Sequence, residues 1–436
     1  MIRWLYALAM VLAQPLLRAK LRRRAAVEPV YGEHTEERFG HYAHAAVPVD
    51  AERPLIWVHA VSLGEARAAA VLVAQLRWQI PGMQLLLTHG TATGRTQGAS
   101  LLQAGDIQVW QPWDTPGAVA RFLAHFRPSV GLLVETEVWP NMVAGCAARG
   151  VPLCLVNARF SEKSLRQSQR LAWLARPAFK GLRAVWAQTQ PDADRLVQMG
   201  AAVAGVMGNF KFDATPDAVQ LAQGRQWRTR ADKPVVLFAS SREGEEQMLL
   251  DIFEGKMPLA PVSIVQAATE NIATSVQWLL VPRHPQRFEE VARLFEAAGL
   301  TVSRRSSWVD GPAVADVWLG DSVGEMATYF GMAHVALLGG SFAPLGGQNL
   351  IEAAACGCPV VMGPHTFNFV EAAELAIGAG AALRCADLPL AVDQAAHLAH
   401  SPTDLQRAVQ ASMNLGQAHR GAAERTAAAI ASLLLR

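Results

Sequence analysis

A glutamate stands close behind an apolar run in the first part of the chain. The run covers residues 55–60, and the segment Ser62-Leu63-Gly64-Glu65 follows it. Gly64 allows a tight turn or the close approach of a ligand. A carboxylate at the end of a strand can act as a general base on an acceptor hydroxyl, which is one interpretation of Glu65. The other interpretation is that Glu65 only complements the dipole of the helix that it begins.

Two further carboxylates, Glu135 and Glu137, follow the apolar residues 130–134. Positions two apart in a strand face the same way. Burying two like charges near each other is costly unless the charges are paired or used. Glu135 is therefore a second candidate for chemistry at a strand end. Helix capping together with one structural salt bridge is the alternative.

Lys211 is the third candidate, and it lies between Phe210 and Phe212 in the polar segment 208–213. A cation at this place could hold a phosphate or a carboxylate group. The alternative is that Lys211 is an exposed lysine of a linker.

The second half of the chain carries several polar and glycine-rich turns, each following an apolar run. They are residues 240–246, 281–285, 320–326, 339–342 and 346–352. Serine and glycine at a helix N-terminus suit an anion, and Arg283 supplies a fixed fork of donors to a phosphate or a base edge. Glu352 either accepts hydrogen bonds from ribose hydroxyls or only complements a helix start. Together these turns predict a phosphate and ribose cradle.

Short apolar strands alternate with helical stretches along the chain. Strands are expected at residues 55–60, 84–88, 106–110, 130–134, 152–156 and 184–187, and again at 235–239, 278–281, 315–319, 335–338 and 359–362. This alternation predicts an α/β protein with two Rossmann-like, doubly wound lobes. Ligands of such sheets gather at the carboxyl ends of the strands, so two lobes indicate an enzyme with an interlobe cleft.

Composition shifts give the expected domain boundaries. They are an N-terminal anchor at 1–24, a first lobe at 25–210, a linker at 211–232, a second lobe at 233–403 and a C-terminal helix at 404–436. The linker is placed in the polar stretch after residue 208, and the last stretch is helical and rich in alanine.

The bulk composition excludes some classes of protein. The chain has 436 residues, of which 51% are hydrophobic and 17% charged, with a net charge of +2. These values fit two buried cores, argue against disorder and give no sign of a nucleic-acid-binding surface. The five cysteines form no regular framework, which fits a reducing cytosol. Cys356-Gly-Cys358 lacks a second ligand pair, so no metal site is expected.

The N-terminus is nearly all apolar from residue 4 to residue 17. A basic cluster follows it, made of Arg18, Lys20, Arg22, Arg23 and Arg24. The run is shorter than the roughly 20 residues of a bilayer-spanning helix, and a signal peptide would carry its charge before the apolar run. The pattern predicts a short anchor that lies in or dips into the bilayer, with the basic cluster on the cytoplasmic side. A helix packed on the protein itself is the alternative.

These segments, in this order, resemble the bacterial 3-deoxy-D-manno-octulosonic acid (Kdo) transferases. The matching stretches are HAVSLGEARAA, LLVETEVWPN, LVNARFS, GNFKFD, EGEE, LVPRHPQRF, GDSVGEM, LLGGSF and GGQNLIEAAACGCPVVMGPHTFNF, and they cover most of the chain from His59 to Phe369. The resemblance is specific because many separate motifs keep both their order and their spacing. It also extends to the apolar and basic N-terminus.

The resemblance implies a GT-B glycosyltransferase that moves Kdo from CMP-Kdo to a lipid A precursor, with inversion, at the cytoplasmic face of the cell inner membrane. Glu65 would then be the base, with Glu135 and Lys211 supporting the transition state. The first lobe would take the lipid acceptor and the second the nucleotide sugar. The implied CMP-binding positions are Pro282, Arg283, Val323, Gly324, Glu325, Asn349, Leu350, Ile351 and Glu352. No metal is implied, since CMP carries one phosphate and has less need of a cation clamp.

Three departures from the family pattern concern local loop geometry. Arg242 stands where histidine is common, Leu350 stands where proline is common, and the segment 261–277 is longer than the usual connection. Two other interpretations stay open: a GT-B transferase that uses a UDP-sugar, and a catalytically silent, membrane-bound nucleotide-sugar sensor. The number of Kdo transfers, the acylation preference and the oligomeric state have no sequence signal.

Overall fold

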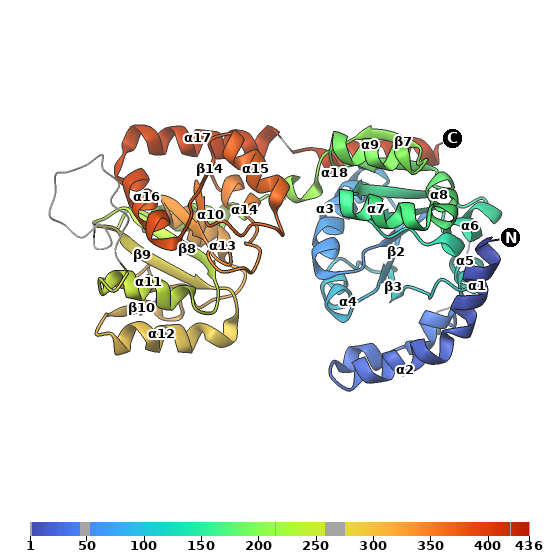
Figure 1. Ribbon diagram of the computed structural model, residues 1–436, viewed down its shortest axis with the longest axis horizontal. Coiled ribbons are helices and arrows are strands. Elements are labelled where there is room, and N and C mark those ends of the chain that lie inside the picture. The colour runs from blue at the N-terminus through green and yellow to red at the C-terminus, as the bar shows by residue number, and fades with distance from the viewer. Residues whose placement is uncertain (1, 44–52, 214, 258–274, 419, 436) are drawn as a thin grey trace. The chain divides into compact units, whose positions relative to one another are not determined.

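The computed structural model describes residues 2–43, 53–213, 215–257, 275–418 and 420–435, which form two compact α/β units. Unit 1 is Met1–Asp213 together with Arg420–Arg436, and unit 2 is Ala214–His419. Figure 1 labels the helices and strands of each unit. The segment at 261–277 that departs in length from the family pattern falls largely outside the described residues.

Unit 1 is built on a parallel sheet of seven strands in the order β3-β2-β1-β4-β5-β6-β7. The strands are β1 Leu55–His59, β2 Gln84–His89, β3 Ile107–Trp110, β4 Val130–Val134, β5 Leu153–Ala158, β6 Ala184–Ala187 and β7 Val203–Val206. The strand order reverses between β1 and β4, which are hydrogen-bonded neighbours. Ligands of open α/β sheets bind at such a reversal, outside the carboxyl ends of the strands.

Helices cover both faces of this sheet, and each face has its own apolar core. One core packs side chains of α5 Pro116–Phe126, α6 Pro140–Ala148, α8 Ala172–Lys180 and α9 Gln190–Gln198. The other packs α3 Leu63–Gln79 beside α18 Ala422–Leu434. The remaining helices in the described part of the unit are α1 Ile2–Leu12, α2 Gln14–Ala25, η1 Pro29–Gly32, η2 Thr35–Phe39, α4 Ala92–Ala99, α7 Glu162–Arg170 and η3 Phe210–Asp213.

Unit 2 repeats this plan with a second parallel sheet, in the order β10-β11-β9-β8-β12-β13-β14. Its strands are β8 Val235–Ser241, β9 Gln277–Pro282, β10 Val302–Arg304, β11 Val317–Leu319, β12 Val335–Leu338, β13 Val360–Met362 and β14 Ala382–Arg384. Here the order reverses between β8 and β12. The two strand ends that flank this reversal lead into the segments 240–246 and 339–342, both of which the sequence marks as candidates for a nucleotide cradle.

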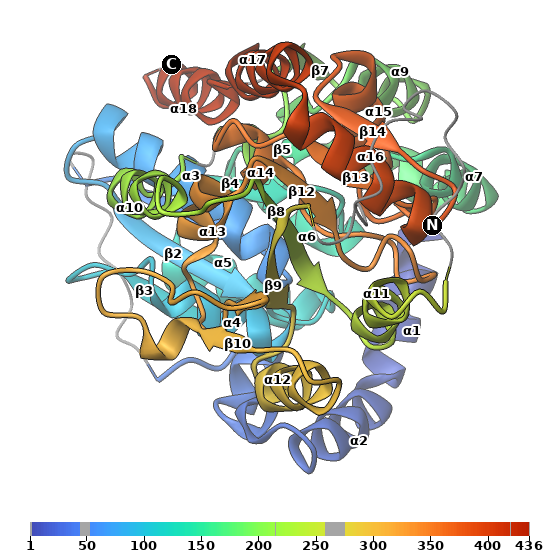
Figure 2. The same ribbon diagram turned by 90° about the vertical axis from the view of Figure 1, so that its left-hand side faces the viewer.

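The helices of unit 2 again lie on both faces of the sheet (Figures 1 and 2). The core of one face holds side chains of α11 Glu245–Phe253, α12 Phe288–Ala297 and α16 Leu388–His400. The other helices among the described residues of this unit are α10 Ala218–Arg228, η5 Pro285–Arg287, η6 Arg305–Ser307, α13 Met326–Met332, α14 Ile351–Ala355, α15 Val370–Gly378 and α17 Pro402–Ala418. The predicted α/β architecture with two doubly wound sheets is therefore confirmed.

Three strands have no counterpart in the sequence prediction: β7, β10 and β14. All three are edge strands of three or four residues. An edge strand has a neighbour on one side only and is partly exposed, so it needs no continuous apolar run. Both β7 and β14 contain exposed residues. Neither strand therefore has the continuous apolar run on which the sequence prediction of strands relied.

The predicted linker at 211–232 contains a helix of unit 2. Helix α10 packs closely along α13, and a side chain at Gly224 would overlap the carbonyl of Thr328. Gly224 also lies against Gly331, so two glycines bring the helix backbones together. Because the outer face of α10 is polar, the sequence pattern did not indicate that this helix packs on unit 2.

The predicted C-terminal helix at 404–436 is two helices that belong to different units. Helix α17 stays in unit 2, whereas α18 packs on α3 in unit 1. The break falls at Gly421, which has a φ of +85°. Asp213 accepts hydrogen bonds from the amides of Gly421, Ala422 and Ala423 and so caps α18.

The N-terminal residues form α1 and α2, which rest on unit 1. Tyr6 donates a hydrogen bond to Asp114, and Ala7 and Leu21 are buried. The other side of the segment exposes large apolar side chains, namely Trp4, Leu5, Leu8, Val11, Leu12 and Leu16. Among the residues that the structure describes, no helix combines the length and the apolar character needed to cross a bilayer.

Candidate active site

The strand reversal in unit 1 gathers the carboxylates that the sequence singled out. Glu65 lies in the first turn of α3, directly after β1, and Glu135 follows β4, the neighbour of β1 in the sheet. Both therefore lie at the carboxyl edge of the sheet where the chain changes direction. Segments 70 residues apart in sequence thus reach one place because their strands are paired.

The Glu65 carboxylate is fixed by hydrogen bonds within its own turn. Its Oε2 accepts the amide of Val61 at 2.8 Å, and its Oε1 accepts the hydroxyl of Ser62 at 3.1 Å. The Ser62 hydroxyl in turn accepts the Glu65 amide at 3.4 Å. This arrangement is close to a capping box, in which a serine and a glutamate three residues later satisfy the first turn of a helix. Glu65 therefore does stabilise the start of helix α3, as one of the two interpretations of this residue held.

The electrostatic surroundings of Glu65 add a second property. Partial burial, together with the nearby charges of Glu135 and Glu137, raises the pKa of its carboxyl group to about 7, against the lowering effect of the Val61 amide and the Ser62 hydroxyl. A base with a pKa near the working pH is the most effective proton acceptor. Glu65 is therefore both a capping residue and a carboxylate suited to general-base catalysis.

Glu135 has an unusual backbone. Its φ is +66°, a left-handed conformation that is uncommon outside glycine, asparagine and aspartate. The strand partners hold it there, since the Glu135 amide donates to Val156 and its carbonyl accepts from the amide of Arg159. Such strain is often stored where a side chain must point in one direction. Burial also raises the pKa of the Glu137 carboxyl group close by.

Lys211 lies in η3, which the structure places at the carboxyl ends of β5, β6 and β7. The amide of Phe210 donates to Asn157 Oδ1 at 3.1 Å, and Asn209 donates to Gln188 Oε1 at 3.0 Å. Phe210 and Phe212 are buried, while Lys211 is half-buried between them. The two aromatic neighbours therefore anchor the segment, and Lys211 sits on the same edge of the sheet as Glu65 and Glu135.

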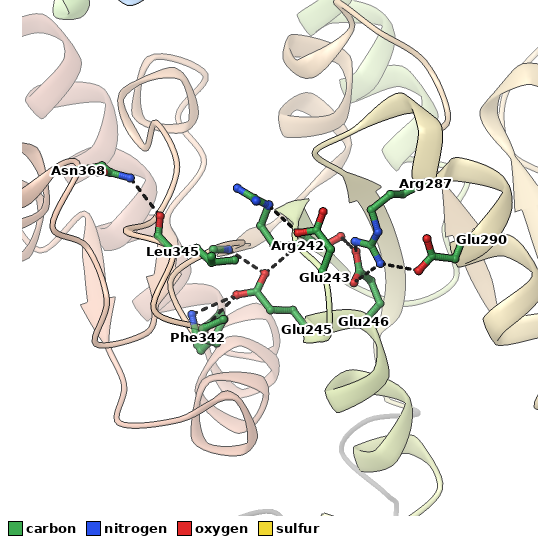
Figure 3. A network of polar contacts seen from close by, with 12 residues as sticks. Arg242, Glu243, Glu245, Glu246, Arg287, Glu290, Phe342, Leu345 and Asn368 are labelled. Atoms are coloured by element: carbon green, nitrogen blue, oxygen red, sulfur yellow. Dashed lines mark hydrogen bonds and ion pairs between the residues drawn. The ribbon is translucent and has the colours of Figure 1, made fainter. Parts of the chain in front are cut away.

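The corresponding strand reversal in unit 2, between β8 and β12, holds two buried glutamates that bind groups of the protein itself (Figure 3). Glu245 accepts the amides of Arg242 at 2.9 Å and Gly340 at 2.8 Å, and it also accepts those of Phe342 and Ala343. Its side chain thus joins the turn after β8 to the loop after β12. Burial raises the pKa of this carboxyl group against the lowering effect of the amides.

Glu246 completes this internal framework. Its carboxylate accepts the Ser241 hydroxyl at 2.7 Å and pairs with Arg287 at 2.9 and 3.2 Å. Arg287 also contacts the exposed Glu290, as Figure 3 shows. The EGEE stretch therefore holds the loops of unit 2 in place. The carboxylates of Glu245 and Glu246 are both occupied by hydrogen bonds or ion pairs within the protein.

Of the sequence candidates, Pro282 ends β9, beside β8, and Arg283 follows directly. The Arg283 amide donates to the Ser241 carbonyl at 3.0 Å, and its side chain is exposed. Pro282 is paired with Ser241 in the sheet. An exposed guanidinium at this edge has its donors available to a ligand.

Val323, Gly324 and Glu325 form the turn that begins α13. Val323 is exposed, and Gly324 has a φ of +86° with open space around its Cα. Glu325 instead pairs with Arg305 at 2.8 Å and accepts the hydroxyl of Ser322. The first two positions are open to a ligand, whereas the Glu325 side chain already holds the turn together.

The segment from Asn349 to Glu352 begins α14. Asn349 Oδ1 accepts the Ile351 amide at 3.1 Å, and its Nδ2 donates to Glu352 at 3.4 Å. Leu350 and Ile351 are 1% and 2% exposed, so these two side chains belong to the core. A ligand would meet the main chain at these two positions, together with the side chains of Asn349 and Glu352.

Comparison with known proteins identifies the family. A sequence model of the 3-deoxy-D-manno-octulosonic acid transferases (kdotransferases) matches residues 33–214. The chain is 46% identical to the 3-deoxy-D-manno-octulosonic acid transferase of Bordetella pertussis over 97% of both chains. The chain belongs to the Kdo transferase family. It is 28% identical to the Haemophilus influenzae member over 97% of this chain and 96% of that one. The resemblance read from the motifs is thereby confirmed, and this Kdo transferase family member is a glycosyltransferase.

Solved structures confirm the fold. The UDP-GlcNAc 2-epimerase of Neisseria meningitidis, bound to UDP-GlcNAc, aligns with a TM-score of 0.55 at 15% identity, over 88% of this chain and all of that one. MurG of Acinetobacter baumannii aligns with a TM-score of 0.51 at 13% identity, over 87% and 99%. At these identities the likeness concerns the architecture, which is the predicted GT-B type.

The cysteines of this Kdo transferase family member are all buried free thiols: Cys146, Cys154, Cys356, Cys358 and Cys385. Burial raises the pKa of the Cys356 thiol to about 12 and also raises that of Cys358. Thiols that stay protonated are poor metal ligands. Within the described part of the chain, no group of three or more His, Cys, Asp or Glu residues is placed to hold a metal ion.

The sequence analysis did not identify the residues whose hydrogen bonds hold the segments of the candidate site in place. The Ser62–Glu65 capping box was readable from its spacing, because serine and glutamate stand three positions apart. The cap by Asp213 on α18 had no such signal, since its partners lie more than 200 residues away. The placement of His89 behind the Glu65 turn also needed the paired strands β1 and β2.

Proposed function

We propose that this protein transfers Kdo from CMP-Kdo to a lipid A precursor with inversion at the anomeric carbon, and that Glu65 is the general base. Family membership supports the donor, the acceptor and the reaction type. The observation that carries the residue assignment is the Glu65 carboxylate, held by the Val61 amide at the strand reversal, with a pKa of about 7.

In this reaction the Glu65 carboxylate takes the proton from an acceptor hydroxyl. The acceptor oxygen then forms a bond to the Kdo anomeric carbon, while the bond from that carbon to the CMP oxygen breaks. CMP leaves with the electron pair, and the configuration inverts because attack and departure occur on opposite faces. Glu135 and Lys211, on the same sheet edge, are proposed to support charge in the transition state.

We assign the donor nucleotide to unit 2. Arg283 offers an exposed guanidinium, Gly324 an open backbone turn, and Asn349 and Glu352 polar side chains at a helix start. The remaining proposed contacts are Pro282, Val323, Glu325, Leu350 and Ile351, of which the last two would act through their main chain. One phosphate can be bound by amides and a guanidinium, so the proposal includes no metal.

We place the protein at the cytoplasmic face of the inner membrane through α1 and α2. A helix that is apolar on its outer side has no reason to face water. Trp4 is 75% exposed and Leu12 is 69% exposed. Several basic residues follow, although Arg18 is already paired with Glu36 at 2.6 Å. Contact with anionic lipids through the remaining basic side chains would bring the protein to its lipid acceptor.

The transfer assay tests the function directly. The protein in detergent is given CMP-Kdo generated in place and a tetra-acylated lipid A precursor, and the products are read by mass spectrometry. We expect a mass increase of one or more Kdo units, and the same spectrum gives the number of transfers. A folded protein that leaves the acceptor unchanged but consumes a UDP-sugar would contradict the assignment.

A vesicle experiment tests the membrane proposal separately. Leu8 and Leu12 are exposed on α1, so the double substitution Leu8→Glu, Leu12→Glu should leave unit 1 folded. We expect this variant to stay in the supernatant when the wild type sediments with vesicles containing anionic lipid. Equal sedimentation of both proteins would exclude α1 as the contact. A matched control places two glutamates at the exposed positions Val206 and Val219, away from α1.

A further inference from the structure

His89 lies directly behind the Glu65 turn, at the end of β2, and its ring is fully buried. Its Nδ1 lies 2.7 Å from the carbonyl oxygen of Ala60, and its Nε2 lies 3.0 Å from the side-chain nitrogen of Gln108. A carbonyl can only accept and an amide NH₂ can only donate. His89 must therefore be a neutral imidazole that carries its proton on Nδ1.

The acceptor of this proton belongs to the peptide group that binds Glu65. The carbonyl of Ala60 and the amide of Val61 form one planar unit, with the C=O and the N–H pointing in opposite directions. The Val61 amide donates to Glu65 Oε2 at 2.8 Å. The bond from His89 thus fixes the orientation of the peptide whose other end holds the carboxylate. Polarisation along such a chain also strengthens each of its hydrogen bonds.

The next peptide is held in the same way. The carbonyl of Val61 accepts the amide of Thr91 at 3.0 Å and its hydroxyl at 2.8 Å, and it also accepts the amide of Gly90. The turn after β1 therefore has no freedom to change direction without breaking contacts to β2 and α4. Space for the imidazole is reserved by Gly98 of α4, where a side chain would overlap the His89 ring.

We propose that His89 is a positioning residue for the transfer reaction: through the Ala60–Val61 peptide it aims and polarises the amide that holds the Glu65 carboxylate. The inference rests on the proposed function of Glu65 as the base. His89 itself touches no reacting atom, because its ring is enclosed by the sheet and α4.

The charges around Glu65 and His89 determine which of the two residues titrates in the pH range of the activity measurement. Glu135 and Glu137 face Glu65 and raise the pKa of its carboxyl group, whereas the Val61 amide lowers it. Arg95 and His59 lie near His89, and burial lowers the pKa of the His89 imidazole to about 4. His89 is therefore neutral wherever Glu65 titrates. A change in the acid limb of activity between pH 6 and pH 8 would report Glu65.

The test compares three variants. His89→Leu removes the donor to Ala60, whereas His89→Asn keeps one, because the side-chain nitrogen of asparagine takes nearly the place of Nδ1. His59→Leu is the matched control: it removes a second buried histidine, at the end of β1, whose Nδ1 contacts Thr88 and not the peptide that holds Glu65. All three substitutions are expected to lower thermal stability.

We expect His89→Leu to lower kcat at pH 7 about tenfold and to move the acid limb of kcat/KM upward by about one pH unit, with the KM for CMP-Kdo unchanged. His89→Asn should return kcat to within about threefold of wild type. His59→Leu should leave the acid limb in place. An unmoved acid limb in His89→Leu, or an equal shift in His59→Leu, would overturn the proposal.

A titration without substrate separates this inference from the proposed function. The pKa of the Glu65 carboxyl group is measured by carbon NMR on protein labelled at the glutamate side-chain carboxyl, with Glu65→Gln for assignment. A higher pKa in His89→Leu supports the positioning role even if Kdo transfer is absent. An unchanged pKa overturns it even if transfer proceeds normally.

Discussion

The two units use the same sheet reversal in opposite ways. In unit 1, the glutamate that opens the helix after the first strand keeps a half-buried carboxylate, with a pKa of about 7 and two other carboxylates nearby. In unit 2, Glu245 opens the helix after the first strand but is fully buried, with amides from two loops around it. The same residue type at the same place is thus the proposed general base in one unit and an internal support in the other.

Each reversal nevertheless holds a residue other than glycine with a left-handed backbone. Glu135 after β4 has a φ of +66°, and Ser240 near the end of β8 has a φ of +55°. Both conformations are costly for residues other than glycine. The difference between the units therefore lies in how the carboxylates are solvated. Four predictions test this comparison, and the one with the largest expected effect comes first.

Glu65→Gln should have the largest effect on catalysis. Removing a general base typically lowers the rate by 10²–10⁴-fold, so we expect kcat to fall about 10³-fold with the fold intact. The measurement is the Kdo transfer assay with circular dichroism as the check on folding. The same change should stabilise the protein at pH 8 by about 1–2 kcal/mol, because the raised pKa gives Glu65 a stability cost that develops between its ordinary pKa of 4.5 and about pH 7 and is fully present above that. At pH 4, where Glu65 is protonated, this gain should vanish.

Glu246→Ala should have the largest effect on stability. It leaves Arg287, which is 9% exposed, without its buried partner, and we expect the free energy of unfolding of unit 2 to fall by about 3 kcal/mol. Glu290→Ala is the matched control, because it removes the exposed partner of the same arginine and should cost less than about 1 kcal/mol. Urea denaturation followed by tryptophan fluorescence measures both. Equal losses would show that burial does not distinguish the two glutamates.

Glu135→Gln should change the pH dependence of the reaction. Its negative charge raises the pKa of Glu65, so neutralising it should lower that pKa and move the acid limb of kcat/KM to lower pH. A shift of about half a unit is expected at ordinary salt, since screening weakens charge interactions near the surface. Glu137→Gln should give a smaller shift in the same direction. A shift to higher pH in either variant would contradict the charge arrangement around Glu65.

Asp213→Ala should destabilise the protein less than Glu246→Ala does. It removes the cap of α18 and should lower the free energy of unfolding of unit 1 by about 1–2 kcal/mol. Asp217 caps α10 in unit 2 by the same type of bond, so Asp217→Ala provides a control with a similar cost in the other unit. Hydrogen exchange of α18 and α10 distinguishes the two variants. Faster exchange of α10 in Asp213→Ala would contradict the assignment of α18 to unit 1.

Much of the molecule was readable from local patterns. Buried strands such as 130–134 and 335–338 were placed exactly as the structure has them, because a strand covered on both faces needs a continuous apolar run. The exposed edge strands, the helix α10 and the division of the C-terminal helices were not readable. Each of these depends on what packs against the segment rather than on its own composition.

The sequence alone determined the order of the motifs, the two parallel sheets and the family to which the chain belongs. It marked Glu65 as a glutamate at a helix start after a strand, and it marked the segment 240–246, which contains Glu245, only as a turn suited to an anion. Only the tertiary structure showed what binds each carboxylate. Glu65 is bound by an amide four residues away, whereas Glu245 is bound by amides of a loop almost 100 residues away. Solvation of a carboxylate depends on every segment that surrounds it, and pairing of distant strands decides which segments those are.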